Sequence, residues 1–133
     1  MELLKRTRTP ALRPDTAMHA TVERSAGTCL VKTSGPITID SSPDLRTLLL
    51  QCLESDNCES LTVDLSGVAY VDTSAIAILL ETLRAARARE KSFQLTGLGG
   101  QPRHLFEVAR LLHLFHQHVD EQPNNDVQPV RLR

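Results

Sequence analysis

The residues best suited to chemistry lie together in the sequence VDTSA, where Asp72, Thr73 and Ser74 directly precede a long helical pattern. Such residues are preferred at helix starts because their side-chain oxygens accept hydrogen bonds from the unpaired N–H groups of the first turn. A phosphate on Ser74 would also lie at the positive end of the helix dipole and would add about −1.5 to −2 charges there. The segment is therefore compatible with two roles, a helix cap and a site of modification.

Other candidate sites lack the partners that their chemistry needs. A metal centre requires three or four convergent ligands, and no carboxylate or Cys stands at matching spacing to the four clustered histidines, which we expect to be solvated: His104, His113, His116 and His118. Asp64 is the single acidic residue at the end of its strand, too few to hold a divalent ion, so it should hydrogen-bond within its own turn. We expect no metal and no cofactor.

The sequence also lacks the motifs of phosphate-binding and nucleophilic enzymes. The sequence TGLGGQ lacks the Lys-Ser/Thr pair of a phosphate-binding P-loop, and no Ser or Cys stands in a recognisable nucleophile elbow. The sequence indicates a protein that is not an enzyme.

Composition narrows the class of protein further. The 133 residues suffice for one domain, the formal net charge is −1, and one Tyr, three Phe and no Trp argue against nucleic-acid binding. The three cysteines have no CxxC spacing and read as small buried hydrophobes in a reducing compartment. No apolar run approaches the roughly 18 residues of a membrane span, so we expect a cytoplasmic protein without direct membrane insertion. The oligomeric state is left open.

The elements that must position VDTSA alternate between strand and helix patterns. We predict a flexible leader (1–17), a domain (18–119) and a flexible tail (120–133). The domain begins with a hairpin that turns at Ala26-Gly27 and a helix capped by Ser42. These are followed by the strand LTVDL, a helix over 73–89, the strand SFQLTGL, a helix from Pro102 and a short last strand in LFHQHV. This order predicts an α/β fold in which a mixed, mostly parallel sheet of four to five strands, with an N-terminal hairpin, packs against helices.

The helix that follows VDTSA has one clear apolar stripe, formed by Ile76, Leu79, Leu80, Leu83 and Ala86. At about 100° per residue, Ala75, Ile78 and Thr82 fall on the side or the far face of the helix. We therefore expect this second set to face away from the core, where it could meet a partner.

The sequence VDLSGVAYVDTSAIAILLETLRAARARE resembles the signature of the STAS domain superfamily, and most of all that of bacterial anti-sigma factor antagonists. The flanking sequences SGPITIDSSPDLRTLLLQCL and FQLTGLGGQPRHLFEVARLLHLF are similar to the first helix with its leading loop and to the closing elements of that family. The resemblance extends over about residues 18–119. It implies a STAS-like fold and a protein that acts by docking and has no catalytic activity.

The resemblance also implies a role for individual residues. The second hydroxyl of the family motif, here Ser74, is phosphorylated by a partner that is both serine kinase and anti-sigma factor, while Asp72 and Thr73 shape the site. Ala75 stands where the family has Gly, and together with Ile78 and Thr82 it would belong to the docking surface.

The loop before the first helix contributes two further candidates. Family members tend to carry an Asp there, and at that position this chain has Thr38, with Asp40 two residues later. Both are candidate partner-binding residues.

STAS domains also occur as subunits of phospholipid-transport ABC systems, docked on the ATPase. In that alternative the same hydroxyl would serve as a contact without phosphorylation. Other STAS domains bind small ligands, which leaves a ligand or metal sensor as a third possibility.

Overall fold

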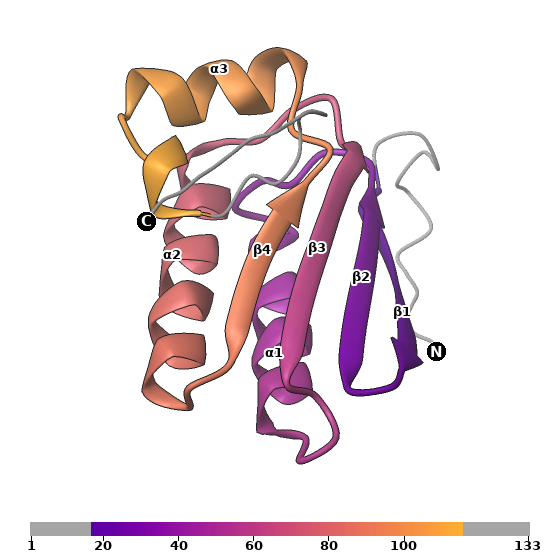
Figure 1. The fold of residues 1–133 in the computed structure, drawn as a ribbon. Helices are drawn as coiled ribbons and strands as arrows, with labels where there is room; N and C mark the ends of the chain where they lie inside the picture. Colours follow the sequence, from indigo (N-terminus) through magenta and orange to yellow (C-terminus); the bar gives the residue numbers. More distant parts are fainter. Residues whose placement is uncertain (1–16, 116–133) are drawn as a thin grey trace.

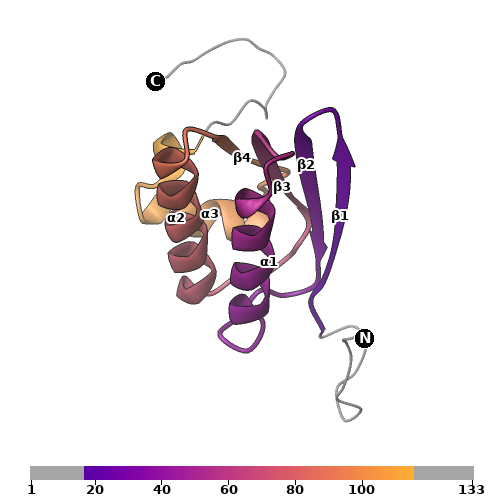
Figure 2. The same ribbon diagram turned by 90° about the horizontal axis from the view of Figure 1, so that it is seen from below.

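One four-stranded sheet carries two helices on the same face in the computed structural model, which describes residues 17–115 (Figures 1 and 2). The elements follow in the order β1 (His19–Ser25), β2 (Thr28–Ser34), α1 (Ser42–Glu54), β3 (Ser60–Gly67), α2 (Thr73–Ala88), β4 (Ser92–Thr96), α3 (Gly100–Val108) and the 3₁₀ turn η2 (Leu112–Leu114). The strand order is β1-β2-β3-β4, with β1 antiparallel to β2 and the other pairs parallel. This confirms the predicted mixed, mostly parallel sheet with an N-terminal hairpin.

The hairpin turns where the sequence predicted. Ala26 and Gly27 both have positive φ angles, 52° and 85°, as a two-residue turn that follows the twist of its strands requires. Within the strands the side chains alternate, so that Val31, Val63 and Leu95 point into the core and their neighbours point to the opposite face.

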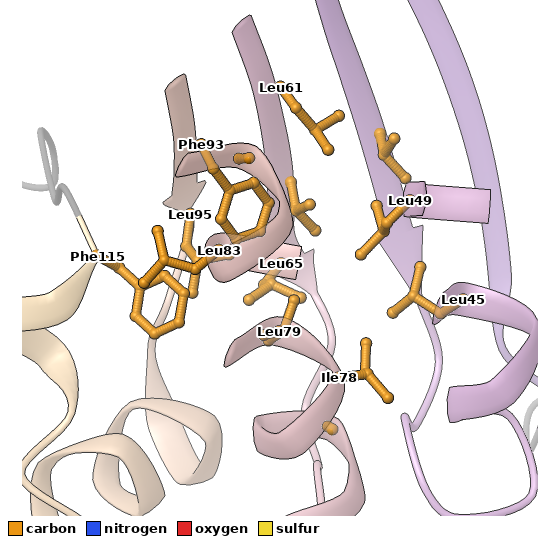
Figure 3. Close-up of a cluster of buried hydrophobic side chains, with 14 of the residues drawn as sticks. Leu45, Leu49, Leu61, Leu65, Ile78, Leu79, Leu83, Phe93, Leu95 and Phe115 are labelled. Carbon is orange, nitrogen blue, oxygen red and sulfur yellow. The ribbon is translucent and has the colours of Figure 1, made fainter. Parts of the chain in front are cut away.

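The core lies between the sheet and the two helices (Figure 3). Phe115 packs edge-on against Phe93 and Phe106 at ring-centroid distances of 6.0 and 5.6 Å and so ties the end of the described chain to β4 and α3. The three cysteines are free and fully buried, and burial raises the pKa of the Cys58 thiol to about 11. They act as small apolar residues, as predicted.

The prediction that Ala75, Ile78 and Thr82 face away from the core is wrong. Their exposed fractions are 0%, 8% and 0%, because α1 lies along the flank of α2 and covers it. Figure 3 places Ile78 between α2 and Leu45 of α1. The Thr82 hydroxyl donates a hydrogen bond to the Ile78 carbonyl at 2.8 Å, which satisfies it inside the helix interface. Helix α2 therefore buries two sides, one against the sheet and one against α1.

Smaller differences concern the helix ends. Helix α1 begins at Ser42, which is buried, so its N-cap is Ser41, one residue earlier than predicted. Helix α3 begins two residues before Pro102 and packs through Phe106, while Val108 is 63% exposed. Leu114 lies in η2 and Phe115 is its C-cap residue, so the predicted last strand does not begin there. Residues 116–119 of that strand, most of the predicted leader and all of the tail lie outside the described residues.

The loops at the C-terminal ends of β2 and β3 come together beside α3 (Figure 1). Ile37, in the loop after β2, forms a parallel bridge with Val71, in the loop after β3, and donates its N–H to the Tyr70 carbonyl at 3.1 Å. This bridge brings the start of α1 next to the start of α2.

Candidate functional site

The side chain of Asp72 fixes Ser74 at the start of α2. Asp72 is the N-cap residue, with extended backbone angles, and its Oδ1 accepts the Ser74 N–H at 2.9 Å and the Ser74 hydroxyl at 2.5 Å. The Asp72 carbonyl accepts the N–H of Ala75 at 3.1 Å. The predicted helix cap is confirmed, and it also holds the hydroxyl of Ser74 in one position.

The other carboxylate oxygen of Asp72 binds the loop before α1. Its Oδ2 accepts the N–H of Ile39 at 2.9 Å, and the Asp72 N–H donates to the Ile37 carbonyl at 3.1 Å. Partial burial alone would raise the pKa of the Asp72 carboxyl. Hydrogen bonds from the Ser74 hydroxyl and from the N–H groups of Ile39, Ser74 and Ala75 outweigh burial and hold that pKa below its usual value. The carboxylate is thus charged at neutral pH and shared between two segments.

Thr38 and Asp40 lie in the tight turn that leads into α1. The Thr38 carbonyl accepts the N–H groups of Ser41 and Ser42 at 2.9 and 2.7 Å, and its hydroxyl accepts the Asp40 N–H at 3.3 Å. Asp40 is exposed and Thr38 is half-buried. The structure therefore brings this turn to Asp72, but the link runs through the backbone of Ile39, which lies between the two residues that the sequence suggested.

Gln101, in the first turn of α3, supports the site from a third element. Its side-chain Oε1 accepts the Val71 N–H and its Nε2 donates to the Val71 carbonyl, both at 2.9 Å. This pair of bonds imitates strand pairing and fixes the residue immediately before Asp72. The bonds from Gln101 hold the start of α3 beside Val71. The three helices of the described residues, α1, α2 and α3, thus all begin at the same end of the sheet.

The exposed side of α2 differs from the predicted docking surface. Ala75 is fully buried, so its methyl group points into the core, whereas Thr73 and Ala77 are exposed and flank Ser74. One turn further, Glu81 forms a bidentate ion pair with Arg46 of α1, with N–O distances of 2.8 and 2.7 Å. These hydrogen bonds hold the pKa of the Glu81 carboxyl below its usual value.

Ile39 and Gln101 were missed by sequence reasoning. Ile39 is 71% exposed, the most exposed of the large hydrophobic residues in the described chain. Its signal is an Ile two residues after the inward-facing Ile37 in an otherwise polar loop, a pattern that also fits a bent strand. Gln101 follows two glycines and reads as part of a turn.

Asp64 and the histidines are the remaining candidate residues. Asp64 Oδ1 accepts the Ser66 N–H at 2.9 Å, which confirms the predicted bond within its own turn. His104 and His113 are exposed, and His116 and His118 lie outside the described residues. Within 17–115, no three His, Cys, Asp or Glu side chains are arranged to hold a metal ion. None of the helices described here is long and apolar enough to cross a membrane.

The arrangement at Asp72 and Ser74 holds one hydroxyl group in a defined position. The Ser74 hydroxyl is oriented by a neighbouring acceptor, is half-buried, and lies at a helix N-terminus where negative charge is favourable. The site therefore presents one oriented hydroxyl, bonded to a carboxylate, at the start of α2.

Comparisons with known proteins identify the family of the chain. The family model described as "Mlab, STAS domain" matches residues 20–116. The anti-sigma-B factor antagonist of Staphylococcus aureus (strain NCTC 8325 / PS 47) is 27% identical over 86 residues, which cover 65% of this chain and 79% of that protein.

Solved structures of similar proteins have the same fold. An anti-sigma factor antagonist from Mycobacterium paratuberculosis superposes with a TM-score of 0.69 and 25% identity, over 77% of this chain and 86% of that one. The Bacillus cell fate determinant SpoIIAA in its phosphorylated form has the same fold, with a TM-score of 0.59 and 14% identity over 70% and 85% of the two chains.

Proposed function

Because the chain belongs to the STAS domain family, we propose that it is a non-catalytic, protein-binding regulator of the anti-sigma factor antagonist type. In this proposal its partner is an anti-sigma factor that is also a serine kinase. The unmodified chain binds that partner, and phosphorylation of Ser74 weakens the binding.

One observation carries the proposal: the Ser74 hydroxyl is held at the start of α2 by Asp72, in the part of the chain that resembles the family motif. In the modification step the Ser74 oxygen attacks the γ-phosphorus of ATP bound to the kinase, a base of the kinase takes the hydroxyl proton, and ADP leaves. The phosphate then lies at the positive end of α2, where the helix dipole favours a negative charge.

The surface around Ser74 supports docking by a partner. Thr73 and Ala77 are small and exposed, and Ile39 offers an apolar side chain on the adjoining loop. Ala75 replaces the Gly of the family motif, but its buried methyl group does not protrude into this surface. A partner that reaches Ser74 therefore meets these three side chains, and a phosphate would add a strong negative charge beside them.

Modification is tested by incubating the full chain with the anti-sigma factor kinase from the same genome and ATP, followed by peptide mass spectrometry. We expect one phosphate, mapped to Ser74. Ser74→Ala should abolish it, whereas Thr73→Ala, which removes the exposed hydroxyl one residue earlier, should retain it. No phosphate, or a phosphate at another residue, would contradict the proposal.

Binding is tested by calorimetry with the same partner. Ser74→Asp should weaken the complex by about tenfold or more, because a charge at a docking surface opposes desolvation. Gln51→Glu adds one negative charge in the last turn of α1, far from Ser74, and should leave the affinity within about twofold. Binding that is indifferent to Ser74→Asp, together with co-purification of an ABC ATPase, would favour a constitutive transporter subunit instead.

A further inference from the structure

The two oxygens of the Asp72 carboxylate connect segments that are more than thirty residues apart in sequence. Oδ1 binds the hydroxyl and N–H of Ser74, at 2.5 and 2.9 Å, and Oδ2 binds the N–H of Ile39 at 2.9 Å. A carboxylate is planar and rigid, so a rotation that withdraws one oxygen also moves the other. The state of Ser74 and the position of Ile39 are therefore mechanically linked.

Ile39 depends on this link because its neighbours are fixed by other contacts. Ile37 is fully buried and bridges to Val71, and Ser42 is buried with its N–H bonded to the Thr38 carbonyl. Between these two anchors the side chain of Ile39 is 71% exposed, and its backbone N–H reaches across to Asp72. Among the bonds of the described residues, this one alone ties the Ile39 backbone to α2.

A phosphate on Ser74 is incompatible with the present position of Asp72. Phosphorylation removes the hydroxyl hydrogen that now bonds to Oδ1 and places about −1.5 to −2 charges next to a carboxylate only 2.5 Å from the modified oxygen. The phosphate oxygens also compete with Asp72 for the N–H groups of the first turn of α2. Repulsion and lost bonding both drive Asp72 away from Ser74.

We propose that Asp72 couples modification of Ser74 to Ile39, so that a phosphate both charges the site and releases the exposed Ile39 from its fixed position. Asp72 acts here as a positioning residue. The biological meaning of the coupling rests on the proposed regulation at Ser74, but the coupling itself does not require the kinase. A partner would thus lose an apolar contact at Ile39 at the same time as it meets a new charge.

The test is an NMR comparison of the full chain with serine and with phosphoserine inserted at position 74 during synthesis. Solvent exchange of the Ile39 amide should become about tenfold faster or more with phosphoserine, because its acceptor is withdrawn. The Val71 amide, which is bonded to Gln101, should change by less than about twofold and serves as the internal control. An Ile39 exchange rate within about twofold of that in the unmodified chain overturns the coupling.

A second comparison separates coupling from a general loosening of the loop. In the Asp72→Ala variant, Ile39 should already exchange at the faster rate, and phosphoserine at 74 should change it by less than about twofold. An acceleration as large as in the wild-type background would mean that the phosphate acts without Asp72, and would overturn the proposal. Should Asp72→Ala not fold, the phosphoserine comparison in the wild-type background still decides.

The two proposals fail differently. If the kinase leaves Ser74 unmodified while inserted phosphoserine releases Ile39, the regulatory function fails and the coupling stands. If the kinase modifies Ser74 and the Ile39 amide is unchanged, the function stands and the coupling fails.

Discussion

Substitution of Asp72 tests the site most directly, because its carboxylate accepts hydrogen bonds from both Ser74 and Ile39. Replacing the N-cap Asp by Ala costs about 0.5–2 kcal/mol in other helices. Here the change also leaves the N–H of Ile39 without its acceptor, and a hydrogen bond of this kind contributes about 0.5–1.5 kcal/mol. Without the carboxylate, the N–H groups of Ile39 and Ser74 can bond to water instead. We therefore expect Asp72→Ala to lower the free energy of unfolding by about 1–3 kcal/mol.

The measurement is urea denaturation of the full chain at neutral pH, with thermal unfolding alongside. Each kcal/mol should lower Tm by about 4–8 °C in a domain of this size. Asp72→Asn should lie between wild type and Asp72→Ala, because Asn caps helices as well as Asp does but has only one acceptor oxygen. A loss below about 0.5 kcal/mol for Asp72→Ala would refute the assignment of these hydrogen bonds.

The pH dependence gives an independent check on the charge of Asp72. Its pKa is lower in the folded chain than the ordinary value of about 3.9, so the folded state binds its proton less readily than the unfolded state. The resulting stability is fully present above about pH 5 and is lost as the pH falls through the folded-state pKa. The difference in unfolding free energy between wild type and Asp72→Asn should therefore shrink between about pH 5 and pH 2. A difference that stays constant over this pH range would contradict the lowered pKa of Asp72. The control variant is Asp56→Asn, in the exposed loop after α1.

Two further predictions test the packing that positions the site. Ile78→Ala should lower the unfolding free energy by about 2–5 kcal/mol in urea denaturation, because Ile78 is only 8% exposed. The control Ala77→Ser, on the exposed side of the same turn, should lower it by about 0.5 kcal/mol. Equal effects of the two substitutions would contradict the buried interface. Gly97→Ala should cost about 2 kcal/mol or more, because Gly97 has φ +74° and an added Cβ would lie 2.6 Å from the backbone nitrogen of Ser66. Gly99→Ala, where φ is −153° and nothing lies within 4 Å, should cost less than about 1 kcal/mol, the cost of Ala at a helix N-cap. A loss in Tm as large as that for Gly97→Ala would refute the steric argument.

The sequence determined the order of the elements and the cap at Asp72. Alternating apolar residues, Ala26-Gly27 and the Asp-Thr-Ser start of α2 are local signals, and each corresponds to hydrogen bonds or side-chain directions set within a few residues. The position of Ser74 at the start of its helix follows from the same local signals. For this reason the predicted strands and α2 match the structure to within a residue or two at most of their ends.

Tertiary structure alone decided which side of α2 is a surface. The apolar stripe through Leu79 predicts one buried side, but the sequence gives no sign that α1 packs along the flank that holds Ile78, and this packing places Ala75 and Thr82 in the interior. The partner of Asp72 was likewise hidden, because the bond from Ile39 joins residues far apart in the chain through a backbone N–H, a group that every residue except proline has. Local patterns fix where a helix starts and which stripe is apolar, whereas long-range contacts depend on how the elements pack together.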